Sequence, residues 1–74
     1  MEIGDRKGEA IWYENLGNAF QSRGEYVKSK EHIEKALAIR MEFGDRKREA
    51  ALYGDLGNVF RSFSKYTLFF YKNV

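Results

Sequence analysis

The side chains of this chain that could do acid–base or metal chemistry are few and isolated. His32 is the one histidine of the sequence, which contains no cysteine. Histidines that bind zinc come with a second ligand at helical or turn spacing, and His32 has none, so we expect it to be a surface side chain. Glu31 and Glu34 share a helix face, but no neighbour would raise the pKa of either for catalysis.

The remaining patterns argue against an enzyme. No Ser/His/Asp set, glycine-rich phosphate loop or metal-ligand cluster is visible, so we expect no catalytic residue, no metal and no cofactor. The run 46–48 is basic, but Asp45 and Glu49 flank it, and a solvated first turn of a helix explains it. Thirteen Lys and Arg against eleven Asp and Glu give a net charge of +2. That balance and aromatic residues at core spacing disfavour a nucleic-acid partner.

Nothing in the sequence predicts a membrane protein. The longest apolar run, 68–71, is far shorter than the roughly 20 residues that a spanning helix needs. The N-terminal residues are acidic with no apolar run behind them, so we expect no secretory signal. We therefore expect a soluble, cytoplasmic protein.

An internal repeat organises the chain. Residues 4–26 return as residues 44–66 with thirteen identities in twenty-three positions. The shared residues include Gly-Asp-Arg-Lys, Glu-Ala, Leu-Gly-Asn and single Tyr, Phe and Ser positions. A repeat of this length is typical of a stacked helical solenoid, in which each unit buries its apolar face against the next. Solenoids mostly bind other molecules.

The apolar spacing predicts helices at about 6–23, 26–43 and 46–63. Asp5 and Asp45 stand where their carboxylates would cap the first and third of these helices, and Gly24 and Gly44 end the first two. After Tyr66 the copy fails, because Thr67-Leu-Phe-Phe-Tyr71 replaces a polar amphipathic run. The sequence therefore predicts a truncated or altered fourth helix.

The expected core lies between these helices. In the second helix the buried stripe is Tyr26, Ile33, Ala36, Leu37 and Met41. Leu52, Leu56, Val59 and Phe63 are expected to cover it from the third helix. Gly17 stands among large apolar residues in mid-helix, which costs about 1 kcal/mol relative to alanine unless a partner helix packs closely there. Its copy, Gly57, predicts the same contact.

The motif Tyr13-x2-Leu16-Gly17-x2-Phe20 resembles the first-helix signature of the tetratricopeptide repeat, with Tyr in place of the usual Trp. The 40-residue period, with Gly-Asp-Arg between units and Leu-Gly-Asn in the first helix, resembles the Pins/LGN class of tetratricopeptide scaffolds. The resemblance implies an all-α helix-turn-helix solenoid fragment, with three helices and a short degenerate fourth. Residues 1–74 would be one array, with repeat 1 at about 4–43 and repeat 2 at about 44–74, truncated or degenerate after Tyr66.

The resemblance also implies a peptide-binding groove lined by the first helix of each repeat. The residues that would carry binding there are Glu14, Asn18, Gln21, Asn58 and Arg61. An exposed Asn amide offers a donor and an acceptor to a peptide backbone. One binding mode of this family clamps a C-terminal carboxylate with Lys and Asn. Glu14 and Gly54 stand where the Lys would be, which argues against that mode and leaves Arg61 as a partner for an acidic ligand.

Two functions remain open. The first is a non-catalytic module that binds a protein or peptide partner. The alternative is an incomplete array that self-associates as a homo-oligomer through its uncapped apolar ends. Trp12 would mark one end, on a face that would cover a preceding repeat, with Leu16 and Ala19 beside it. Phe69 and Phe70, in a segment rich in β-formers, would mark the other.

Overall fold

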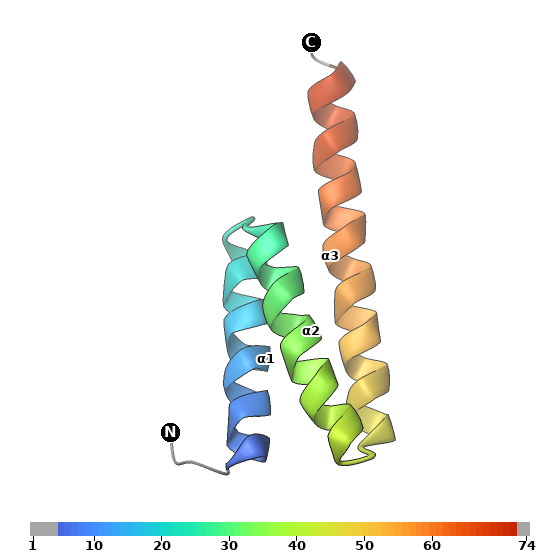
Figure 1. The fold of residues 1–74 in the computed structure, drawn as a ribbon. Coiled ribbons are helices and arrows are strands. Elements are labelled where there is room, and N and C mark those ends of the chain that lie inside the picture. The colour runs from blue at the N-terminus through green and yellow to red at the C-terminus, as the bar shows by residue number, and fades with distance from the viewer. Residues whose placement is uncertain (1–4, 73–74) are drawn as a thin grey trace.

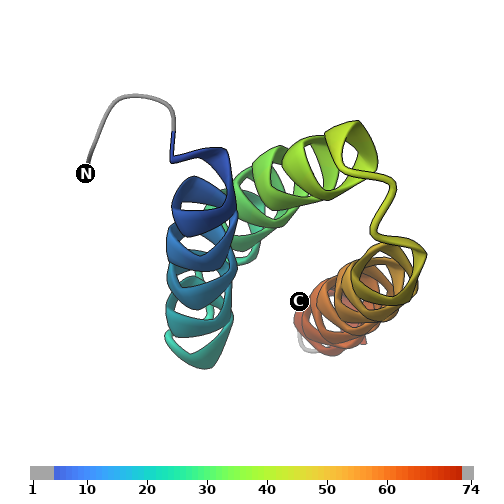
Figure 2. The ribbon, with the colours of Figure 1, turned by 90° about the horizontal axis from the view of Figure 1, so that it is seen from below.

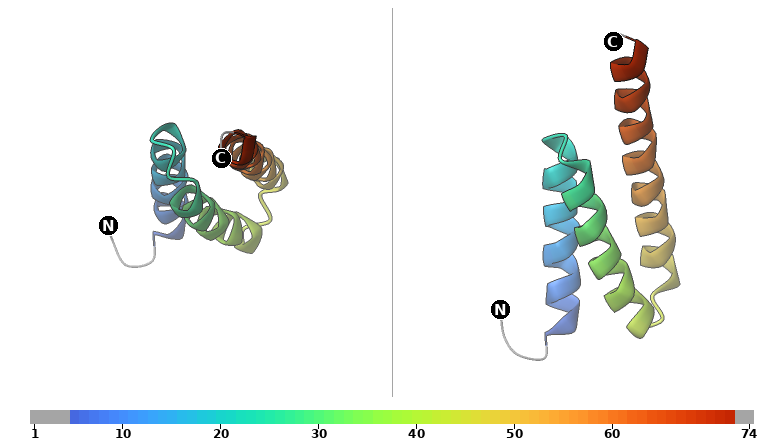
Figure 3. Two further views of the ribbon diagram at one scale, coloured as in Figure 1. Left: turned by 90° about the horizontal axis from the view of Figure 1, so that it is seen from above. Right: turned by 45° about the horizontal axis from the view of Figure 1, so that its top comes forward.

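The computed structural model of the chain describes residues 5–72, apart from the side chains at positions 66 and 69–71. Three helices follow one another: α1 (Arg6–Ser22), α2 (Tyr26–Glu42) and α3 (Arg46–Lys72). Successive helices run antiparallel, and α2 packs against both of the others (Figure 1). Viewed along the helices, α1 and α3 stand on either side of α2 like the two sides of an arch (Figures 2 and 3). The predicted all-α repeat architecture is confirmed.

The two turns form where the sequence predicts them. The Asp5 carboxylate accepts a hydrogen bond from the Gly8 amide at 2.8 Å, and Asp45 accepts one from the Arg48 amide at 3.2 Å. These bonds satisfy backbone donors that the first turn of a helix leaves free. Gly24 has a φ of 76° and Gly44 a φ of 66°. Glycine adopts this left-handed conformation without the steric cost that other residues bear, so both positions reverse the chain.

The expected fourth helix is wrong, because α3 continues through residue 72 as one helix of 27 residues. The copy of Gly24 in the second repeat is Ser64. Serine carries a Cβ, so it resists the positive φ that the first turn uses, and the helix goes on. The last turns of α3 extend past the turn between α1 and α2 (Figure 3).

The core lies on both sides of α2. Ile33, Ala36 and Leu37 are buried with Leu52 and Val59 of α3. Ile39 is also buried, which the predicted stripe missed. Met41 is 53% exposed, so its predicted burial is wrong. It lies about 40° round the helix from Leu37, beyond the edge of the α3 contact.

The two mid-helix glycines differ in their surroundings. A Cβ on Gly17 would lie 2.7 Å from Cγ1 of Ile33, which confirms the close approach of α2. The Ser29 hydroxyl donates a hydrogen bond to the Gly17 carbonyl at 2.7 Å. Gly57 has no such neighbour within 4 Å, so the expectation that it also holds the core is wrong. The helix that would have packed there, the second of its repeat, does not form within residues 46–72.

Candidate binding groove between the first and third helices

The predicted groove residues of α1 share one side of that helix. Residues 11, 14, 18 and 21 follow helical spacing, and Glu14 reaches across to Arg48 of α3, so this side faces α3. Asn18 is exposed and Gln21 is half-buried. On α3, Arg48 bonds Glu14 of α1, and Asp55 and Ser62 follow Arg48 at seven-residue spacing on the same helix face. Asn58 is exposed one turn beyond Asp55. The concave side of the arch is therefore lined mainly by polar side chains from both walls, with the exposed Ile11 among them.

Glu14 is a buried residue that forms ion pairs with the two other helices, not an exposed groove residue. Its side chain is 10% exposed. One carboxylate oxygen accepts from Nε of Arg40 in α2 at 2.8 Å, and the other accepts from the guanidinium of Arg48 in α3. Glu14 therefore joins α1 to both other helices. Sequence reasoning assigned it to the groove wall because its two basic partners lie 26 and 34 residues away along the chain.

Two aspartates, Asp45 and Asp55, lie beside the arginines that bond Glu14. Nη1 of Arg40 lies 3.6 Å from a carboxylate oxygen of Asp45. Burial raises the pKa of Asp55; the positive charge of Arg48 opposes the rise and the negative charge of Glu14 adds to it. Asp55 was not predicted as a site residue. The signal that could have found it is its seven-residue spacing from Arg48 on the same helix face.

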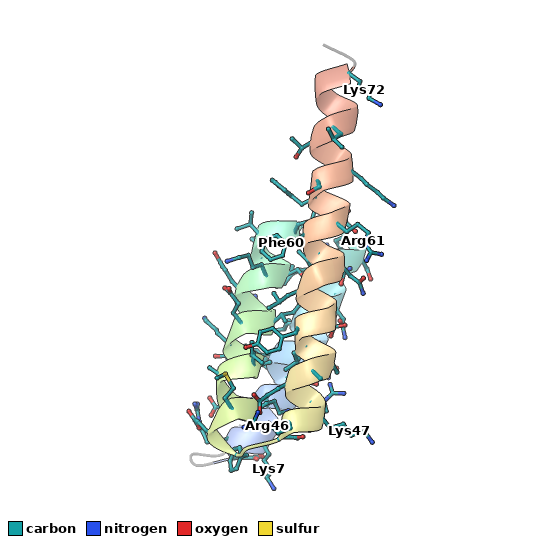
Figure 4. All side chains as sticks on the ribbon, turned by 90° about the vertical axis from the view of Figure 1, so that its right-hand side faces the viewer. Lys7, Arg46, Lys47, Phe60, Arg61 and Lys72 are labelled. Atoms are coloured by element: carbon teal, nitrogen blue, oxygen red, sulfur yellow. The ribbon has the colours of Figure 1, made fainter. Side chains whose placement is uncertain are left out.

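Arg61 lies farther from the groove than predicted. It is exposed, and Figure 4 shows it on the opposite edge of α3 from Phe60, which lies toward α2. The structure thus places Asn18 and Asn58 on the two walls, Glu14 beneath them, and Arg61 on the outward side of α3.

A second ion pair joins the start of α1 to the end of α2, close to Arg40. Arg6 bonds Glu42 at 2.8 Å and Glu9 at 2.9 Å. The hydrogen bond with Arg6 lowers the pKa of Glu42, and that bond raises the pKa of Arg6. Both Arg6 and Glu42 are well exposed, so this pair adds little to stability.

Other predicted residues are placed as follows. Trp12 is 50% exposed on α1, with its ring 5.2 Å from that of Tyr13. His32 is half-buried and packs 4.9 Å from the ring of Phe20, with Nδ1 donating to the Lys28 carbonyl at 2.7 Å. The expected surface position therefore holds in part, because one side of the ring packs against α1. Phe69 and Phe70 lie in α3, and their side chains fall outside the described part.

Two absences hold for residues 5–72. Within them, no group of three or more His, Cys, Asp or Glu side chains could hold a metal ion. None of the described helices is long and apolar enough to cross a membrane.

A hollow of about 570 Å³ lies outside the groove, where α3 passes the turn between α1 and α2. Phe63 lines it from α3, opposite residues 23–28. Phe63 is 48% exposed, so the expectation that it covers α2 holds only in part. The sequence could not predict this hollow, because it depends on the straight course of α3.

Comparison with known families decides the class of the chain. The family model for the tetratricopeptide repeat matches residues 8–68. The chain belongs to the tetratricopeptide repeat family. No curated protein and no solved structure matches it. Members of this family generally mediate protein–protein interactions and generally do no chemistry of their own.

Proposed function

We propose that this tetratricopeptide repeat chain is a non-catalytic, cytoplasmic interaction module that binds a peptide segment in the groove between α1 and α3. We further propose that it is of the Pins/LGN type, with repeats at about 4–43 and 44–74. The 40-residue period and the Leu-Gly-Asn motif in both first helices support this type. The identity of the groove rests on the side chains that line it.

The observation that carries the proposal is the position of Glu14. It ties α1 to Arg40 of α2 and to Arg48 of α3, so it holds the two walls in a fixed relation. A site with fixed walls loses less entropy when a ligand binds. Asn18 and Asn58 remain exposed on those walls, where their amides can bond to the N–H and C=O groups of an extended peptide.

The charge of Glu14 does not repel a ligand in this arrangement. Its two oxygens are matched by Arg40 and Arg48. Arg48 keeps 43% of its side chain exposed, and Asp55 lies on the same face of α3. A ligand segment with alternating charge therefore fits the α3 wall better than one of a single sign.

The test uses a peptide selected from a displayed random library against the whole chain. Asn18→Ala and Asn58→Ala should each lower the affinity for that peptide by about fivefold, since each removes a hydrogen bond worth about 1 kcal/mol. Glu31→Ala, an exposed site on α2, is the control and should leave the affinity unchanged. If both Asn variants bind as tightly as the parent, the peptide does not use this groove.

One observation favours the self-association alternative. Leu52 is fully buried against α2, whereas Trp12, its copy in the first repeat, is half-exposed on α1. An apolar side chain that buries a neighbour in one repeat and lies open in the other is typical of an association surface. Light scattering coupled to size-exclusion chromatography decides it: a monomer at high micromolar concentration excludes this alternative, and a dimer that Trp12→Lys dissociates supports it.

A further inference from the structure

The outward face of α3 is a second copy of the surface on which α2 sits. We define the outer face of α3 as Arg46, Tyr53, Gly57, Phe60 and Arg61, with Phe60 at its edge toward α2 and Arg61 at the opposite edge. Forty residues earlier the same positions are Arg6, Tyr13, Gly17, Phe20 and Gln21. Figure 4 looks onto the outer face, with Arg46, Phe60 and Arg61 labelled.

The first repeat shows what this surface binds. On α1 it holds an antiparallel helix, α2, by three kinds of contact. Ile33 packs so closely on Gly17 that a Cβ there would clash. Near the start of α1, Arg6 bonds Glu42 from the end of α2. The Ser29 hydroxyl of α2 also donates a hydrogen bond to the Gly17 carbonyl at 2.7 Å.

On α3 the same surface is uncovered. Tyr53 is 56% and Phe60 52% exposed, and nothing lies within 4 Å of a Cβ placed on Gly57. Ala50 is exposed, although its copy Ala10 is fully buried. A bare glycine in mid-helix costs about 1 kcal/mol, which a closely packed helix would offset. The surface therefore has the shape of a helix-binding face without a helix on it.

The outer face of α3 carries more positive charge than the matching face of α1. Gly54 replaces Glu14 and Arg61 replaces Gln21, and α3 continues to Lys65 one turn beyond Arg61, so α3 is more positive than α1. Lys47, Arg61 and Lys72 follow one edge of the helix in Figure 4. A helix like α2 would lose the partner of its Arg40, because Gly54 stands in place of Glu14. A second copy of α2 is therefore a poor fit, and an acidic helix is a good one.

We propose that the outer face of α3 docks an acidic amphipathic helix of a partner protein, antiparallel to α3. A small or β-branched residue of that helix packs on Gly57, as Ile33 packs on Gly17. Its carboxylates meet Arg46 near its C-terminal end and Arg61 and Lys65 nearer its N-terminal end. This face is separate from the groove between α1 and α3, so the two sites can be tested independently.

The probes are two synthetic peptides built on residues 25–43, the α2 segment. The unmodified peptide carries four acidic and four basic residues. The acidic peptide carries Lys28→Glu and Arg40→Glu. Binding to the whole chain is measured by fluorescence anisotropy. The acidic peptide should bind at least about tenfold more tightly, because its added carboxylates meet the basic edge of α3.

Three protein variants locate the site. Gly57→Leu should weaken binding of the acidic peptide by about tenfold or more, since the leucine side chain fills the contact. This variant should fold normally, because nothing lies within 4 Å of a Cβ at position 57. Glu31→Ala, at an exposed position on α2, should bind like the parent. Arg61→Glu with Lys65→Glu should reverse the preference toward the unmodified peptide.

Four results would overturn the proposal. They are equal affinity for the two peptides, an affinity that Gly57→Leu does not change, binding lost in Glu31→Ala, and a preference that survives the charge reversal. Other occupants give their own outcomes. If the chain is a dimer that Gly57→Leu dissociates, the occupant is a second copy. If it binds phosphatidylserine vesicles through Arg61 and Lys65 and neither peptide, the face meets a membrane surface.

Discussion

Replacing each mid-helix glycine by alanine compares one residue in two environments. Gly17 and Gly57 follow a leucine and precede an asparagine in both repeats. At both sites alanine gains about 1 kcal/mol of helix propensity. At Gly17 the new Cβ lies 2.7 Å from Cγ1 of Ile33, so α2 must shift. Overpacking of this kind costs about 1–3 kcal/mol. At Gly57 nothing lies within 4 Å, and the gain is kept.

The difference between the two variants therefore measures the contact alone, about 1–3 kcal/mol. In a chain of this size each kcal/mol moves the melting temperature by about 4–8 °C. Gly57→Ala should melt above the parent, and Gly17→Ala should melt clearly below Gly57→Ala. A shift of α2 would also strain the bond from Ser29 to the Gly17 carbonyl, which adds to the loss. Thermal unfolding followed by circular dichroism at 222 nm measures both.

A second background identifies the clashing atom. Ile33→Ala removes Cγ1, so in that background the two alanine variants should melt at the same temperature. If Gly17→Ala and Gly57→Ala are equally stable in the parent, the close approach of α2 at Gly17 does not exist in solution. If they still differ in Ile33→Ala, another atom causes the clash.

Two further predictions concern the carboxylates. Glu14→Gln should lower the melting temperature more than Glu42→Gln, because Glu14 is buried and bonded to both Arg40 and Arg48, whereas Glu42 is half-exposed; equal losses would show that Glu14 does not join the helices. Asp55→Asn should raise the melting temperature at pH 7, because burial raises the pKa of Asp55 and the folded state therefore disfavours its charge. As pH falls, the Asp55 carboxyl becomes protonated at a higher pH in the folded chain than in the unfolded chain. The rise in melting temperature caused by Asp55→Asn should therefore shrink as pH falls toward the ordinary pKa of 3.8 and vanish below it. A rise that does not change with pH would refute this assignment.

Local patterns predicted the fold where local chemistry decides it. The caps at Asp5 and Asp45 and the turns at Gly24 and Gly44 follow from short-range hydrogen bonds and backbone sterics, and both were predicted. The fourth helix was expected because the repeat was extended past its last identity. Ser64, at the one position that decides the turn, already differed from Gly24 in the sequence.

The site was harder to predict, because its contacts join distant residues. Spacing placed Asn18 on the correct side of α1. It could not show that Glu14 is buried, since that depends on Arg40 and Arg48 from two other helices. Arg61 was assigned to the groove by analogy. Its place on the outward side of α3 follows from helical geometry once Arg48 fixes which side faces α1.

The straight course of α3 also decides at which end of the molecule Lys72 lies. With a reversal at Ser64, residues 65–72 would run back beside α2. As a continuous helix they rise away from it, at about 1.5 Å per residue. The two courses separate the position of residue 72 by roughly 24 Å, about half of the 49 Å length of the molecule. A glycine at position 64 would allow the chain to turn back beside α2. Serine at that position leaves the end of α3 projecting beyond the other two helices.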